Sequence, residues 1–176
     1  MSIIKEYKLP KDLLEKLGRE GERTWKSTNI QDKADHFFNF CVTSLSLRDW
    51  CLAYLELEGS DKNQFFEKHS QSEWLNYCGS IANASKHFKL LSGRKSAVES
   101  VESKVSTLVT LGSNGQVIEG AESERVSFDI QVSEGETKDL MTVIFHCVVQ
   151  WEEVFENYGI PKPELNIKAK MFIENI

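Results

Sequence analysis

The residues best suited to chemistry lie in the stretch IANASKHFKL at positions 81–90. Asn83 and His87 are four residues apart, so on a helix their side chains lie one above the other on the same face. An imidazole can act as a general acid or base near neutral pH, and a neighbouring amide can orient a substrate or a phosphate. Lys86 lies beside this face, where its ammonium could hold a negative charge, and Ser80 lies about two turns before His87. The stretch therefore predicts either an acid–base site or the polar side of an ordinary helix.

A second polar cluster, Arg48-Asp49-Trp50, interrupts an otherwise apolar helical segment. One interpretation is a surface ion pair beside a core tryptophan. In the other, Asp49 reaches across the helices to Lys86 or His87, where a carboxylate would fix the imidazole tautomer or neutralise a buried lysine. Both interpretations stay open from the sequence.

The remaining histidines indicate packing and not metal binding. His36 is expected to pack at the start of the long apolar helix, and His146 falls among core positions of the last helix. His69 is expected at a helix end, where a cation would oppose the helix dipole. Because no three of the histidines have ligand-like spacing, we predict no metal site.

The cysteines fall within apolar, helix-like segments and form no CxxC pair. A free cysteine packs like a small apolar side chain, so we predict buried thiols in a reducing compartment. The four positions are Cys41, Cys51, Cys78 and Cys147.

Composition and missing motifs exclude several classes of protein. There is no GxxxxGK[ST], GxGxxG, GxSxG or HExxH sequence, and no cofactor is predicted. The formal net charge of −6 argues against nucleic-acid binding by general electrostatics. The start of the chain lacks a signal-peptide core, and no run approaches the ~20 apolar residues that span a bilayer, so we predict a cytoplasmic protein that does not enter a membrane.

Helical periodicity dominates the first half of the chain, over about 10–92. A short helix is expected from Pro10, weakened at Gly18 and Gly21. A long helix should follow over about 30–58, ended by Gly59. After a short helix or turn with Phe65 and Phe66, the spacing of Ser70 and Glu73 predicts a capping box before the helix that contains IANASKH.

The pattern then changes to a β insertion over about 104–138. Asn114-Gly115 is a strong hairpin signal, and Val126, Phe128, Ile130 and Val132 alternate along one strand. A core helix over about 139–158 follows, and the tail at 160–176 is expected as an edge strand or a mobile end. We predict one α+β domain over 1–176, an α-helical bundle with a small antiparallel sheet inserted before its last core helix.

The order of RDW, IANASKH, strands and a final Trp-containing helix over about 30–158 resembles uncharacterised bacterial and phage proteins that carry a DW dipeptide and an AN-x-x-KH motif. The helical pattern also resembles the HEPN superfamily, which includes ribonucleases of toxin–antitoxin and antiphage systems. Their hallmark is Arg, four to six residues and His, often with Asn after the Arg. Asn83 and His87 match that motif, but Ala82 stands where the arginine should be.

The resemblance implies a homodimeric helical module in which Arg stabilises phosphate and His handles the proton. Without the arginine we expect a HEPN-like interaction or regulatory module that lacks conventional ribonuclease chemistry, with a protein, RNA or nucleotide partner. The alternative is a ribonuclease or nucleotide-modifying enzyme. It would use His87 as general acid/base, Asn83 and Lys86 on the phosphate as a replacement for the arginine, and Asp49 to orient the imidazole.

Overall fold

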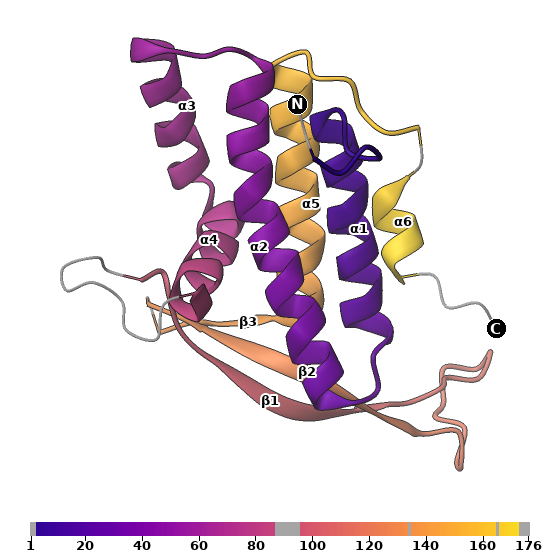
Figure 1. Cartoon of the computed structure of the whole chain (residues 1–176). Coiled ribbons are helices and arrows are strands. Elements are labelled where there is room, and N and C mark those ends of the chain that lie inside the picture. The colour runs from indigo at the N-terminus through magenta and orange to yellow at the C-terminus, as the bar shows by residue number, and fades with distance from the viewer. Residues whose placement is uncertain (1–2, 87–95, 134, 165, 173–176) are drawn as a thin grey trace.

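The computed structural model of the 176-residue chain describes residues 3–86, 96–133, 135–164 and 166–172. It has the predicted α+β composition, with a small antiparallel sheet placed before the last long helix. Figure 1 shows α1, α2 and α5 running side by side above one face of this sheet. The elements are α1 (Pro10–Lys26), α2 (Ile30–Tyr54), α3 (Gly59–Gln71), α4 (Glu73–Lys86), β1 (Val98–Leu108), β2 (Ser123–Val132), β3 (Thr137–Asp139), α5 (Leu140–Asn157) and α6 (Ile167–Phe172).

The core lies between the long helices and the sheet face beneath them. Trp151 and Phe155 of α5 and Phe40 of α2 are fully buried there, as their helical spacing predicts. Both helices begin at a local cap. The side chain of Asn29 accepts hydrogen bonds from the first backbone amides of α2, and that of Asp139 does the same for α5. Within the described ranges, no helix combines the length and the apolar character needed to cross a membrane.

The sheet has the strand order β1-β2-β3, with both pairs antiparallel. Phe128, Ile130 and Val132 of β2 are buried, which confirms the predicted alternation. β1 begins at Val98, earlier than the expected start near residue 104. The predicted turn is also present, since Gly115 has φ +76° and donates its amide to the carbonyl of Gly112.

The glycines of α1 do not weaken it, contrary to the prediction, and the helix runs through both. They are where α6 approaches most closely. A Cβ on Gly18 would lie 2.4 Å from Cγ2 of Ile167, and one on Gly21 would lie 2.5 Å from Sδ of Met171. The predicted edge strand in the tail is wrong as well. The alternating residues 165–173 contain the short helix α6, because Ile167 and Met171 are one helical turn apart and both are buried against α1.

The boundaries around α3 also differ from the prediction. α2 ends at Tyr54 and Gly59 begins α3, where the sequence predicted one helix to residue 58. Glu56 has φ +51° and the chain reverses there, which brings Phe65 of α3 edge-on to Tyr158 after α5. Ser70 lies inside α3, so the expected capping box with Glu73 is wrong. The spacing of residues does not show that Phe65 is buried against Tyr158, and this contact favours the chain reversal.

Candidate functional site

The described part of the predicted site on α4 lies against the core. Ser80 accepts a hydrogen bond of 3.2 Å from the backbone amide of Ala97, which ties α4 to the segment leading into β1. Asn83 is half-buried, and the side chain of Ala82 is fully buried. His87 and the side chain of Lys86 lie outside the described residues.

The second predicted cluster forms a surface ion pair. Nη2 of Arg48 lies 3.0 Å from Oδ1 of Asp49, and the guanidinium lies 5.0 Å above the ring of Phe66. Trp50 is half-buried and packs against the core. Asp49 faces an open hollow of about 720 Å³ between the end of α2 and α3. The ion pair of the first interpretation is therefore present. The second interpretation concerns the side chains of Lys86 and His87, which lie outside the described residues, and it stays a prediction.

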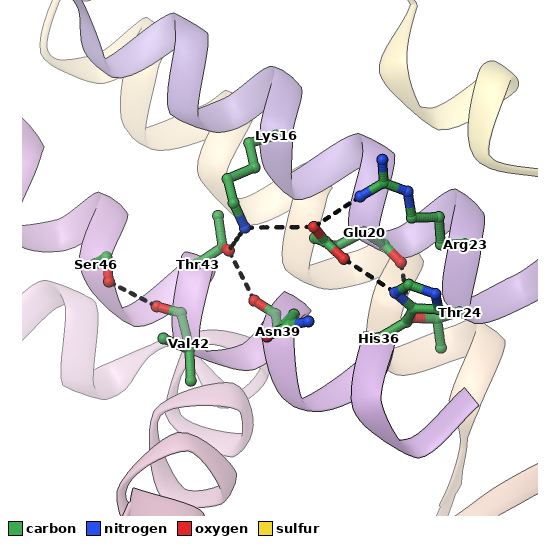
Figure 2. Close-up of polar contacts among 9 residues, drawn as sticks. All are labelled: Lys16, Glu20, Arg23, Thr24, His36, Asn39, Val42, Thr43 and Ser46. Carbon is green, nitrogen blue, oxygen red and sulfur yellow. Dashed lines mark hydrogen bonds and ion pairs between the residues drawn. The ribbon is translucent and has the colours of Figure 1, made fainter. Parts of the chain in front are cut away.

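A polar cluster that sequence reasoning missed joins α1 to α2, and Glu20 is its centre (Figure 2). The Glu20 side chain is only 7% exposed. One carboxylate oxygen lies 3.1 Å from Nη1 of Arg23 and 3.5 Å from Nζ of Lys16, and the other lies 3.3 Å from Nδ1 of His36. The cationic neighbours balance the carboxylate, as burial of a charge requires.

Hydrogen bonds extend this cluster along α2. Nζ of Lys16 donates to Oγ1 of Thr43 at 2.6 Å, and that hydroxyl donates to the carbonyl of Asn39 at 2.7 Å (Figure 2). At the other end, Lys33 is almost fully buried and donates to the carbonyls of Thr24 and Trp25 in the last turn of α1. A cation there meets the negative end of the helix dipole. Burial, followed by the nearby Arg125, lowers the pKa of Lys33 to about 8.

The cluster has a chemical capacity beyond packing. When Nδ1 of His36 donates to Glu20, the carboxylate fixes the tautomer and leaves Nε2 to exchange a proton with another molecule. The side chain of His36 is 32% exposed, and the side chain of Arg23, which shares Glu20 with it, is 55% exposed. His36 was expected to pack, and it does so through this polar contact.

A signal for Glu20 does exist in the sequence. Leu13, Leu17 and Thr24 are buried on the same side of α1, and Glu20 completes their helical spacing. A charged residue at a core position requires a partner from another element, but the sequence does not show which element supplies it.

His69 is a buried histidine on α3. It is 6% exposed, and its Nε2 has no hydrogen-bond partner in the described structure. It borders a pocket of about 140 Å³ between α3 and α5, together with Ser72, Gln150 and Glu153. The pKa of His69 is lowered to about 4, chiefly by burial and then by the nearby Arg48, while Asp49 opposes the shift. The expectation of a cation opposing the helix dipole is therefore wrong, because His69 is neutral at physiological pH.

The thiols are buried and free, as predicted, and burial raises the pKa of Cys51 to about 12. Sγ of Cys147 lies 3.3 Å from Oγ of Ser44, which accepts a hydrogen bond from the indole of Trp151. No cluster of three or more potential metal-ligating side chains occurs among the residues that the structure describes.

Comparison with known proteins adds no family to this geometry: no family model, no curated protein and no solved structure matches the chain.

Proposed function

We propose that this protein is an interaction or regulatory module built on a HEPN-like helical bundle, without conventional ribonuclease chemistry. The observation that carries the proposal is the position of Ala82. Its side chain is 0% exposed and belongs to the core. The resemblance to HEPN ribonucleases would require the phosphate-stabilising arginine at this position.

Because Ala82 is buried, this chain differs from the HEPN motif by more than the absence of one surface arginine. An arginine there would enter the core, where an unpaired cation costs several kcal/mol. The next residue, Asn83, is half-buried and begins the face on which His87 would follow. An active site of the usual HEPN type would therefore need this helix turned relative to its present packing.

A buried set of free cysteines supports a reducing compartment, since such thiols persist unpaired in the cytoplasm. We propose that the module acts in the cytoplasm of a bacterium or of a phage-infected cell, as a homodimer or with a protein, RNA or nucleotide partner.

The test is a cleavage assay of the purified protein on mixed cellular RNA, with and without Mg²⁺. We expect no cleavage by folded wild type. Cleavage by wild type that His87→Ala abolishes, with an unchanged circular dichroism spectrum, would overturn the proposal.

The Glu20–His36 contact favours a second candidate, a ribonuclease or nucleotide-modifying enzyme that works from the α1–α2 face. His36 would move the proton, Glu20 would hold its tautomer, and Arg23 would hold a phosphate. The 3.3 Å contact of the imidazole with a buried carboxylate and its partial exposure are the observations that support it.

The same assay separates the two candidates. Cleavage that His36→Ala removes and His87→Ala leaves intact would support the second candidate. A fall of about 10²–10⁴-fold is expected when a general acid–base group is lost. Asp35→Ala is the matched control, because Asp35 is an exposed neighbour of His36 outside the Glu20 cluster.

A further inference from the structure

Among the residues that the structure describes, no strand pairs with the outer edge of β1. β1 is the first strand in the order β1-β2-β3 and pairs with β2 on one side only. Within the described ranges, the backbone of residues 99–108 forms no hydrogen bond outside the β1–β2 pairing. A long edge of this kind presents unpaired amides and carbonyls that another strand can use. In Figure 1, β1 runs along the margin of the molecule and its hairpin extends beyond the helices.

The apolar side chains of this edge are only partly covered. Val101 is opposite Ile130, and Val105 is opposite Val126, so both valines belong to the sheet face that packs beneath the helices. Ile130 is fully buried, whereas Val101 is 36% and Val105 63% exposed. The apolar face of the sheet thus continues to the edge, where the described part of the chain covers it only in part.

The sequence of β1 is symmetric in character about Ser103. Val101 and Val105 lie two residues to either side of it. Glu102 and Lys104 flank it directly, and serine stands at both positions 100 and 106. When two copies of this strand run antiparallel with Ser103 on the two-fold axis, Val101 of each copy meets Val105 of the other, and Glu102 of each copy meets Lys104 of the other.

We propose that β1 pairs with β1 of a second copy of this chain, antiparallel and with Ser103 opposite Ser103, to form one continuous six-stranded sheet. The two-fold axis stands perpendicular to the sheet, so both helical layers lie on the same face. Val101 and Val105 of the two copies then cover one another on that face. Glu102 of each copy lies opposite Lys104 of the other on the reverse face.

The charges around Lys104 support this register. Lys104 forms an ion pair with Asp129 and lies 3.4 Å from Asp139, and Glu102 is directly opposite Asp129 in the sheet. Within a chain, Lys104 thus pairs with two carboxylates, and Glu102 lies opposite one of them. The pairing gives each Glu102 a cation directly across the new strand contact.

Neighbouring registers lack this complementarity. Moving the axis to Glu102 puts two glutamates opposite each other, and moving it to Lys104 does the same with two lysines. Like charges directly opposite across strands are destabilising. Charged residues on an edge strand ordinarily prevent pairing with another strand. In β1, the opposite charges of Glu102 and Lys104 allow pairing in the register centred on Ser103.

This inference deepens the proposed function, because it names the surface through which the module associates. It rests on the proposed function in one respect, that the role of the module is association. The two fail separately, because the RNA assay reports on chemistry and the experiments below report on self-association.

The first experiment is sedimentation velocity of the full chain from about 1 to 200 μM, with Ser103→Cys as the reporter of register. We expect a wild-type dimer, and a disulfide-linked dimer of Ser103→Cys after mild oxidation. Ser106→Cys is the matched control, since position 106 faces position 100 of the second copy and should not cross-link to itself. The native cysteines are buried and give little background.

Charge reversal tests the pairing itself. Glu102→Lys alone places lysine opposite lysine, and Lys104→Glu alone places glutamate opposite glutamate, so each should raise the dimer dissociation constant by about tenfold or more. An equimolar mixture of the two variants restores both opposite-charge pairs, and a heterodimer should form. Glu99→Lys controls for net charge, because Glu99 lies outside the Val101–Val105 core of the pairing.

A wild type that stays monomeric at 200 μM would overturn the proposal and leave the edge to solvent or to a different protein. A dimer in which Ser103→Cys cross-links no better than Ser106→Cys would overturn it too, because another surface would then hold the copies together. Failure of the mixed charge variants to associate would exclude the register.

Discussion

The carboxylate of Glu20 lies 3.3 Å from Nδ1 of His36, and this contact joins the first two helices through a side chain that is 7% exposed. The same carboxylate also pairs with Lys16 and Arg23. Glu20 is thus the electrostatic centre of the α1–α2 interface. It also orients the imidazole of His36.

Glu20→Gln should lower the free energy of unfolding by about 2 kcal/mol, because it leaves Lys16 and Arg23 without their shared counter-charge beside a buried amide. Urea unfolding followed by circular dichroism measures the change. Glu22→Gln is the control. Its carboxylate pairs with Lys26 at the surface, so the cost there should stay within about 1 kcal/mol. Equal losses in both variants would contradict the central role of Glu20.

Gly18→Ala should destabilise the protein although alanine favours helices. The helix gains about 1 kcal/mol from the substitution, but overpacking against Ile167 costs about 1–3 kcal/mol. Gly79→Ala in α4 is the matched control, since its new Cβ would lie 3.8 Å from Leu45, an ordinary contact. That variant should be stabilised by up to about 1 kcal/mol.

A double mutant identifies the cause. Against an Ile167→Ala background, Gly18→Ala should no longer destabilise, because the space that its Cβ needs has been opened. The prediction would be wrong if the loss persisted in that background, and the glycine would then serve some purpose other than the close approach of α6.

The buried imidazole of His69 should make stability depend on pH. Its folded pKa is about 4, below the unfolded value of about 6.5, so the unfolded state takes up the proton first as pH falls. The stabilisation is complete above pH 6.5 and is lost between pH 6.5 and pH 4, by about 2 kcal/mol at pH 5. Urea midpoints at pH 7.5 and pH 5 measure it.

His69→Gln removes this titrating group and keeps the others. The variant should lose less stability than wild type between the two pH values, by about the same 2 kcal/mol. Identical pH dependence of the two proteins would contradict the prediction, because it would mean that His69 has the same pKa in the folded and the unfolded state.

Ala82→Arg should unfold the protein or cost more than about 4 kcal/mol, because it places a cation and a long side chain in a fully packed position. Ala84→Arg, two residues along the same helix, is the control. Ala84 is exposed, and the change there should stay within about 0.5 kcal/mol. Thermal melts followed by circular dichroism distinguish them, and a folded Ala82→Arg protein would mean that α4 can turn its face outward.

Local signals in the sequence predict much of this fold. The period of apolar residues in α5, with Asp139 at its start, and the alternation of Phe128, Ile130 and Val132 in β2 each depend on neighbours within a few residues. A helix or strand with one apolar face has to bury that face, so the α+β composition and the inserted sheet followed from pattern alone.

Local signals failed where a distant segment set the outcome. Gly18 and Gly21 read as helix weakeners because nothing near them in sequence reveals Ile167 and Met171, which need the space that glycine leaves. The tail alternates like a strand, yet its burial against α1 favours a helical turn. Packing between segments far apart in the chain outweighs intrinsic propensity.

The sequence by itself therefore determined the long core helices α2 and α5, the alternating strand β2 and the order of these elements. The tertiary structure alone decided that Glu20 shares its charge with His36, that Ala82 faces the core, and that the symmetric strand β1 lies at a sheet edge. Each of these depends on a contact, or an absent neighbour, between elements, and the free energy of such contacts is set by burial and charge pairing that no local pattern records.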